Sequence, residues 1–160
     1  MKKAINYTAT FAAIIVLILS ASSCKKEVTN PLEKTPAEKI IGKWVLKSLK
    51  VEYFDGANVK VHEESSLPFE IIYEFSPKQI TVTAFDLTGS VPYFFITENG
   101  KNYITYEDEE DKKTVKSLIE FQSDNHLRIS VEKRNDSYLD ETSGELIPAR
   151  SVTIQKMERM

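Results

Sequence analysis

The sequence predicts an all-β domain that folds as an antiparallel, up-and-down β-barrel of about eight strands, preceded by a short helical turn. Short runs of β-branched and aromatic residues are separated by turn residues, and several runs alternate apolar and polar side chains. No stretch between the runs could hold the crossover helices of a parallel sheet, which excludes an α/β fold. Strands are expected at residues 43–53, 70–76, 79–85, 92–97, 101–107, 116–122, 126–133 and 149–157, and a long polar connection at 134–145.

The helical turn is expected at the start of the domain. Thr35 can act as its N-cap, and Pro36 suits the first helical position. Glu38 lies at the spacing of a capping box, and Gly42 can end the turn. One or two helical turns should therefore lead directly into the first strand.

Two strands show where their side chains should point. Phe69, Ile71, Tyr73 and Phe75 share one parity, opposite to Glu70 and Glu74, which places four large side chains on one inner face. In the first strand the apolar residues change parity after Leu46, which predicts a β-bulge near residues 47–48. A bulge there would help the sheet to curve and close.

Composition excludes several classes of function. The 160 residues carry a net charge of −3, without the concentrated basic face of a nucleic-acid binder. The single cysteine excludes a disulfide framework within the chain and any multi-thiolate metal site. The two histidines, His62 and His126, have no partner at ligand or triad spacing. We therefore expect no enzyme, no metal and no cofactor, although carboxylates that meet only in the fold keep catalysis as a distant third possibility.

The first residues have the layout of a secretory signal. Lys2 and Lys3 precede an apolar run at residues 11–19, which is shorter than the ~20 residues of a transmembrane helix. Small residues follow and end at Ser23, directly before Cys24. This stretch resembles the lipobox of bacterial lipoproteins. An ordinary secretory signal that leaves an unpaired thiol is the alternative.

The lipobox resemblance implies a cellular location and a membrane anchor. The signal peptide would be residues 1–23, and Cys24 would carry diacylglyceryl and an acyl chain such as palmitate. Residues 24–36 would form the lipid anchor and a flexible tether, and residues 37–160 the barrel domain. Lys25 follows the cysteine in place of the aspartate associated with inner-membrane retention, so the resemblance implies the outer membrane of a Gram-negative cell envelope. Which membrane face the domain occupies stays open.

A second resemblance concerns the barrel. Gly42-Lys43-Trp44, after a helical turn and at the start of a strand-rich region, resembles the Gly-x-Trp motif of lipocalin-like barrels. The resemblance implies that Gly42 and Trp44 are structural residues that close one end of the barrel. In that family a basic side chain from the last strand often covers the Trp. Arg150, Lys156 and Arg159 are the possible partners in this sequence.

The aromatic strands suggest a ligand pocket. An eight-stranded barrel can be filled by its own side chains or can hold one small ligand. The leading hypothesis is a lipid-anchored protein that binds a small hydrophobic or amphipathic ligand without catalysis. The alternative is an envelope scaffold with a filled core, whose loops bind an unknown protein or a polysaccharide. The candidate pocket residues are Phe69, Ile71, Tyr73, Phe75, Tyr93, Phe95 and Tyr103.

Overall fold

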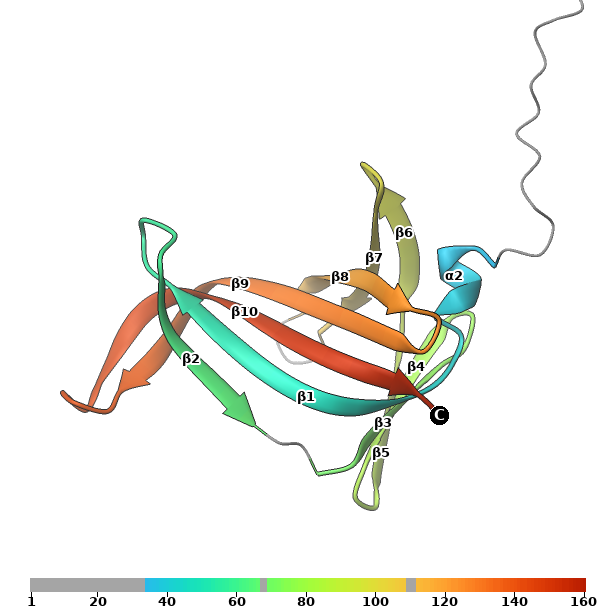
Figure 1. Cartoon of the computed structure of the whole chain (residues 1–160), viewed down its shortest axis with the longest axis horizontal. Helices are drawn as coiled ribbons and strands as arrows, with labels where there is room; N and C mark the ends of the chain where they lie inside the picture. Colours follow the sequence, from blue (N-terminus) through green and yellow to red (C-terminus); the bar gives the residue numbers. More distant parts are fainter. Residues whose placement is uncertain (1–33, 67–68, 109–111) are drawn as a thin grey trace, which may run out of the picture. The chain divides into compact units, whose positions relative to one another are not determined.

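The computed structural model describes residues 34–66, 69–108 and 112–160, and Lys34–Met160 form one compact unit (Figure 1). The described residues confirm the all-β prediction, since they form one antiparallel sheet of ten strands and one short helix. The predicted signal peptide 1–23, Cys24 and most of the predicted tether 24–36 lie outside the described residues. The elements are α2 (Pro36–Lys39), β1 (Gly42–Phe54), β2 (Lys60–Ser66), β3 (Ile71–Phe75), β4 (Gln79–Ala84), β5 (Leu87–Pro92), β6 (Phe94–Glu98), β7 (Lys101–Glu107), β8 (Thr114–Ser123), β9 (His126–Asp140) and β10 (Glu145–Arg159).

The sheet curves into a nearly closed, up-and-down barrel of the lipocalin-like kind. Its strand order is β5-β4-β3-β1-β10-β9-β8-β7-β6, with β2 also paired to β1. Tyr93 alone separates β5 from β6, so a single stretch of chain pairs first with β4 and then with β7. The backbone N–H of Tyr93 donates to the carbonyl of Lys78 at 3.0 Å. The bent stretch thereby joins the two ends of the sheet, and counting it as one strand leaves about eight strands in the wall.

The start of the domain follows the prediction. The Thr35 hydroxyl accepts from the N–H of Glu38 at 3.3 Å, and the Glu38 carboxylate accepts from the N–H of Thr35 at 2.8 Å. This is the capping box, with Pro36 in the first turn of α2. The pairing of β1 with β10 shifts register between Leu46 and Ser48, where the bulge was predicted.

The structure corrects the prediction at two strands that were not expected. β2 is almost entirely polar, and its pairing with β1 is accompanied by ion pairs from Glu63 to Lys50 at 2.9 Å and to Lys60 at 2.8 Å. β5 contains a glycine and ends at a proline, both of which are turn signals. Both strands form because a neighbour offers its backbone hydrogen bonds, and side-chain pattern alone does not show this.

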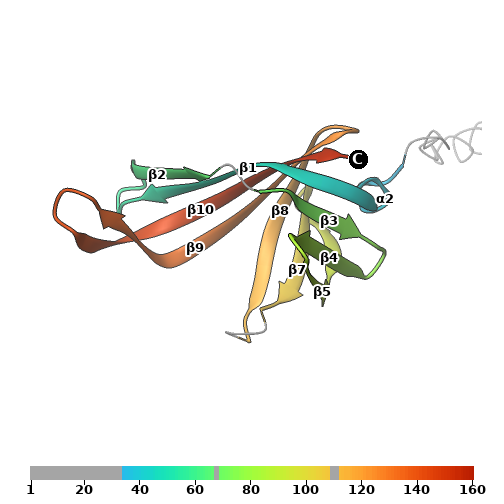
Figure 2. The same ribbon diagram turned by 90° about the horizontal axis from the view of Figure 1, so that it is seen from below.

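The prediction of a long polar connection at 134–145 is also wrong in part. β9 continues to Asp140 and β10 begins at Glu145, so a tight hairpin replaces the long loop. Polar groups fix this pairing, since the buried Ser151 hydroxyl donates to the Asp136 carboxylate at 2.6 Å. The hairpin, β2 and the second half of β1 extend away from the barrel as a projecting sheet (Figures 1 and 2).

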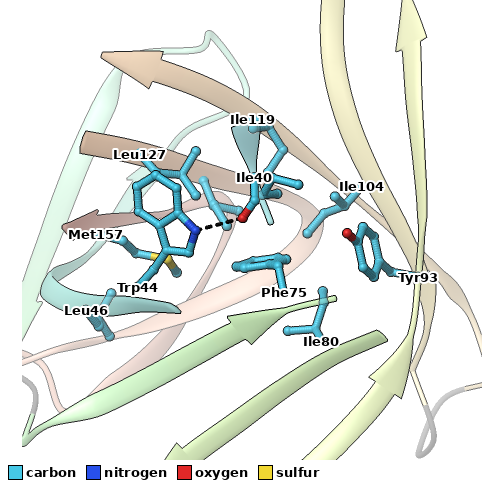
Figure 3. Packing of buried hydrophobic residues seen from close by; sticks show 11 residues of the cluster. Ile40, Trp44, Leu46, Phe75, Ile80, Tyr93, Ile104, Ile119, Leu127 and Met157 are labelled. Atoms are coloured by element: carbon cyan, nitrogen blue, oxygen red, sulfur yellow. Dashed lines mark hydrogen bonds between the residues drawn. The ribbon is translucent and has the colours of Figure 1, made fainter. Parts of the chain in front are cut away.

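The core fills one end of the barrel. Trp44 is fully buried, and its indole N–H donates to the carbonyl of Ile40 at 2.8 Å (Figure 3). Because Ile40 caps α2, the helix is fixed against the base of the barrel. The buried cluster comprises Ile40, Trp44, Leu46, Phe75, Ile80, Tyr93, Ile104, Ile119, Leu127, Ile129 and Met157.

Candidate ligand site

A cavity of about 230 Å³ lies inside the barrel. Side chains from seven wall strands surround it, from β3, β4, β5, β7, β8, β9 and β10. The lining residues are Tyr73, Phe75, Ile80, Val82, Val91, Ile104, Tyr106, Ser117, Ile129, Val131 and Gln155. The filled base and this cavity together make the interior partly packed and partly hollow.

The cavity has an apolar part that is continuous with the core. Phe75, Ile80, Ile104 and Ile129 belong to both the cavity lining and the buried cluster. The first three are labelled in Figure 3. Tyr93 packs edge-on against Phe75, with ring centroids 5.9 Å apart. This part of the cavity can contact only the apolar portion of a ligand.

Four polar side chains line the same cavity. Gln155 donates from its amide nitrogen to the Tyr73 hydroxyl at 3.3 Å. Tyr106 and Ser117 are also part of the lining, and Ser117 is only 1% exposed. The cavity therefore offers hydroxyl and amide groups beside its apolar surface, which is the arrangement expected for an amphipathic ligand.

Burial further favours the neutral form of the two tyrosines. It raises the pKa of Tyr73, although the hydrogen bond from Gln155 acts in the opposite direction. It also raises the pKa of Tyr106, where an interaction with Ser117 opposes the rise. Both phenols therefore keep their protons at physiological pH and can donate hydrogen bonds.

The lining of the cavity carries no aspartate, glutamate, lysine, arginine or histidine among the described residues. Across the described ranges, no cluster of three or more histidine, cysteine, aspartate or glutamate side chains could hold a metal ion. None of the helices in the described part of the chain has the length and apolar character needed to cross a membrane.

The predicted pocket residues occupy several environments. Tyr73 and Phe75 line the cavity, whereas Ile71 and Phe95 are half-buried and pack against the core. Tyr93 is buried beside the cavity, and its hydroxyl donates to the carbonyl of Ser76 at 2.8 Å. The structure therefore brings five of these side chains into or against the barrel interior.

The other two predicted pocket residues lie elsewhere. Phe69 precedes β3, is 58% exposed and contacts Phe85, with ring centroids 4.3 Å apart. Tyr103 lies beneath the ammonium group of Lys116, which is 4.3 Å from its ring centroid. Neither side chain reaches the cavity.

Most of the cavity lining was not predicted. Ile80 and Val82 alternate with polar residues, as do Ile129 and Val131, so period-two alternation was available as a signal. Ser117 and Gln155 gave no such signal, because polar residues on strands are normally assigned to the solvent-exposed face of the sheet. Inward-facing polar residues are recognised only once the strand register is known.

The base of the barrel brings together Gly42, Trp44 and Arg159. The guanidinium carbon of Arg159 lies 4.2 Å from the centre of the Trp44 ring. Its Nη1 donates to the carbonyl of Ile41 at 3.0 Å, its Nη2 to that of Lys39, and its Nε to that of Asp124 at 3.1 Å. Arg159 is thus the partner of Trp44, and Arg150 instead lies over the ring of Phe54, at 4.2 Å.

Comparison with known proteins identified no relative of this chain. No protein family, curated protein or solved structure matches this chain. Function is therefore inferred from the cavity, the closed end and the sequence.

Proposed function

We propose that this protein is a lipid-anchored lipoprotein of the cell envelope whose lipocalin-like barrel binds one small apolar or amphipathic ligand without catalysis. The cavity of about 230 Å³ is the observation that carries the proposal. Its walls combine apolar side chains with a few hydroxyl and amide groups, which is typical of small-molecule sites.

The size of the cavity limits the ligand. An apolar cavity of ~150 Å³ can hold benzene, whereas pockets for drug-sized ligands occupy ~300–1,000 Å³. At about 230 Å³ the site suits a molecule with one ring or a short acyl chain. A porphyrin or a complete long-chain fatty acid is too large for it.

The closed end supports the lipocalin-like assignment. Gly42 and Trp44 open the first wall strand, and Arg159 at the end of the last strand covers the indole ring. This is the arrangement that the Gly-x-Trp resemblance implies. It seals the base of the barrel, so ligand exchange should occur at the opposite end.

Thermal unfolding with ligands of graded size tests the binding proposal. A ligand that binds only the folded protein increases the free energy of unfolding by RT ln(1 + [L]/Kd) and thereby raises the unfolding temperature. We expect benzyl alcohol and hexanol to raise it in a concentration-dependent way and a porphyrin to leave it unchanged. The proposal fails if no compound with one ring or a short chain raises the unfolding temperature at millimolar concentration.

The envelope location rests on the sequence. Cys24 follows an apolar run and small residues, and the chain after it is polar. Several acyl chains on Cys24 would anchor the protein durably at the outer membrane, since each buried CH₂ contributes ~0.8 kcal/mol. Metabolic labelling with a palmitate analogue should mark the wild type and not Cys24→Ser. Equal labelling of both proteins would exclude this anchor.

A second function, binding of a protein partner, is favoured by the tip of the projecting sheet. Leu139 and Leu146 face each other across the β9–β10 hairpin and are 52% and 68% exposed. Paired exposed leucines at a hairpin tip form an apolar surface that another envelope protein can contact. Crosslinking in cells should recover a partner with the wild type and lose it with Leu139→Lys combined with Leu146→Lys. Recovery of the same partner with both proteins would exclude this surface.

A further inference from the structure

We propose that the cavity selects electrically neutral ligands that carry a hydrogen-bond acceptor, and rejects carboxylates of the same shape. This inference rests on the proposed ligand-binding function and specifies the class of ligand. It follows from two features of the lining: hydrogen-bond donors are present, and no cation is present among the described residues that form it.

The tyrosine hydroxyls are two of these donors. Tyr73 accepts a hydrogen bond from Gln155, so the proton of its hydroxyl remains available for donation into the cavity. Tyr106 offers a second neutral hydroxyl from β7. A carbonyl, amide or ether oxygen of a ligand can accept from these groups while the rest of the ligand contacts Phe75 and Ile129.

Strand alternation excludes cations from the cavity. Lys116 precedes Ser117 and Lys156 follows Gln155, so each lysine is one residue from an inward-facing polar side chain. Successive side chains on a strand point to opposite faces. Lys116 accordingly pairs with Glu98 and covers the ring of Tyr103, and Lys156 is exposed.

A carboxylate inside this cavity would have no counter-ion. Transfer of an ionised group from water to an apolar site without an opposite charge is far more costly than transfer of a neutral amide that keeps its hydrogen bonds. The hydroxyls of Tyr73 and Tyr106 can donate to a carboxylate, but they cannot neutralise it. The size and shape of the cavity would admit an amide and a carboxylate equally, so the charge of the ligand decides which one binds.

Matched ligand pairs test this inference. Benzamide and benzoate have nearly the same shape and differ in charge, as do hexanamide and hexanoate. Calorimetric titration at pH 7.5 should give dissociation constants at least about 100-fold lower for the amides. Affinity for benzoate should rise as the pH falls towards the carboxyl pKa, because the neutral acid then becomes available.

The outcomes separate this inference from the function on which it rests. Equal affinity for amide and carboxylate, or tighter binding of the carboxylate, would overturn the selection for neutral ligands and leave ligand binding intact. Binding of neither member of either pair, together with no effect of benzyl alcohol or hexanol on the unfolding temperature, would overturn ligand binding itself and with it this inference.

Three variants locate the selection in named side chains. Tyr73→Phe removes one donor and should weaken benzamide binding about tenfold. Tyr103→Phe makes the same change outside the cavity and should leave binding unchanged. Gln155→Lys places a cation beside Tyr73 and should shift preference towards benzoate. Unchanged benzamide affinity in Tyr73→Phe, or unchanged preference in a folded Gln155→Lys protein, would contradict the proposed basis of selection.

Discussion

The guanidinium group of Arg159 stacks over the indole ring of Trp44 at 4.2 Å and joins the last strand to the first at the base of the barrel. The same guanidinium donates to backbone carbonyls of Ile41 and Asp124, on two different connections. A single side chain therefore holds together the helix end, the first strand and the β8–β9 turn.

Replacing Arg159 should destabilise the whole barrel. Arg159→Ala loses a cation–π contact and charge-assisted hydrogen bonds to backbone carbonyls that are then left without this donor. We expect a loss of about 2 kcal/mol or more in the free energy of unfolding. Urea unfolding of the two proteins measures this difference in the free energy of unfolding. Lys156→Ala, at an exposed position on the same strand, is the control and should change stability by less than about 0.5 kcal/mol.

Gly42 is required because of its backbone conformation and its neighbour. Its φ is +130°, and a Cβ atom there would lie 2.7 Å from Nη1 of Arg159. Gly42→Ala should therefore destabilise the protein by about 1–3 kcal/mol. Gly89→Ala is the matched control, because a Cβ at Gly89 would meet no atom within 4 Å. Equal melting temperatures for the two variants would contradict this role of Gly42.

The wall of the barrel could be predicted from the sequence better than its closure. Alternating side chains indicate the wall strands, and Gly42 and Trp44 indicate the base. The partner of Trp44 could not be chosen, because Arg150, Lys156 and Arg159 are equivalent until the register of β1 with β10 is known. The apolar part of the cavity could be predicted from alternation, as at Tyr73, Phe75 and Ile129, whereas inward polar residues such as Gln155 have no distinctive pattern.

The projecting sheet should lose stability in acid through Glu63. Hydrogen bonds from Lys50 and Lys60 lower the pKa of Glu63 to about 2, from an ordinary value of 4.5. A carboxylate with a lowered pKa stabilises the folded state above pH 4.5, and this contribution disappears as the pH falls through about 2.

Comparison of wild type with Glu63→Gln isolates this contribution. The difference in stability between the two proteins should be present at pH 6 and should shrink as the pH is lowered to 2, and salt should reduce it. Glu70→Gln, at an exposed carboxylate outside this cluster, is the control. A Glu63 pKa near 4.5 in an NMR titration would contradict the account.

Filling the cavity should abolish ligand binding without unfolding the protein. Val82 lines the cavity from β4, so Val82→Phe places an aromatic ring in the space that a ligand would occupy. We expect the unfolding temperature to change little, because the added ring enters existing space, and the response to benzyl alcohol to disappear. Val61→Phe, on the exposed face of β2, should keep the wild-type response.

Native and denaturing mass spectrometry of the protein purified from a Gram-negative host tests ligand binding most directly. We predict a discrete small adduct on the wild type under native conditions, its release on denaturation, and its absence from Val82→Phe. A wild-type protein that carries no adduct and binds neither benzamide nor hexanamide would contradict the proposal that the barrel holds a ligand.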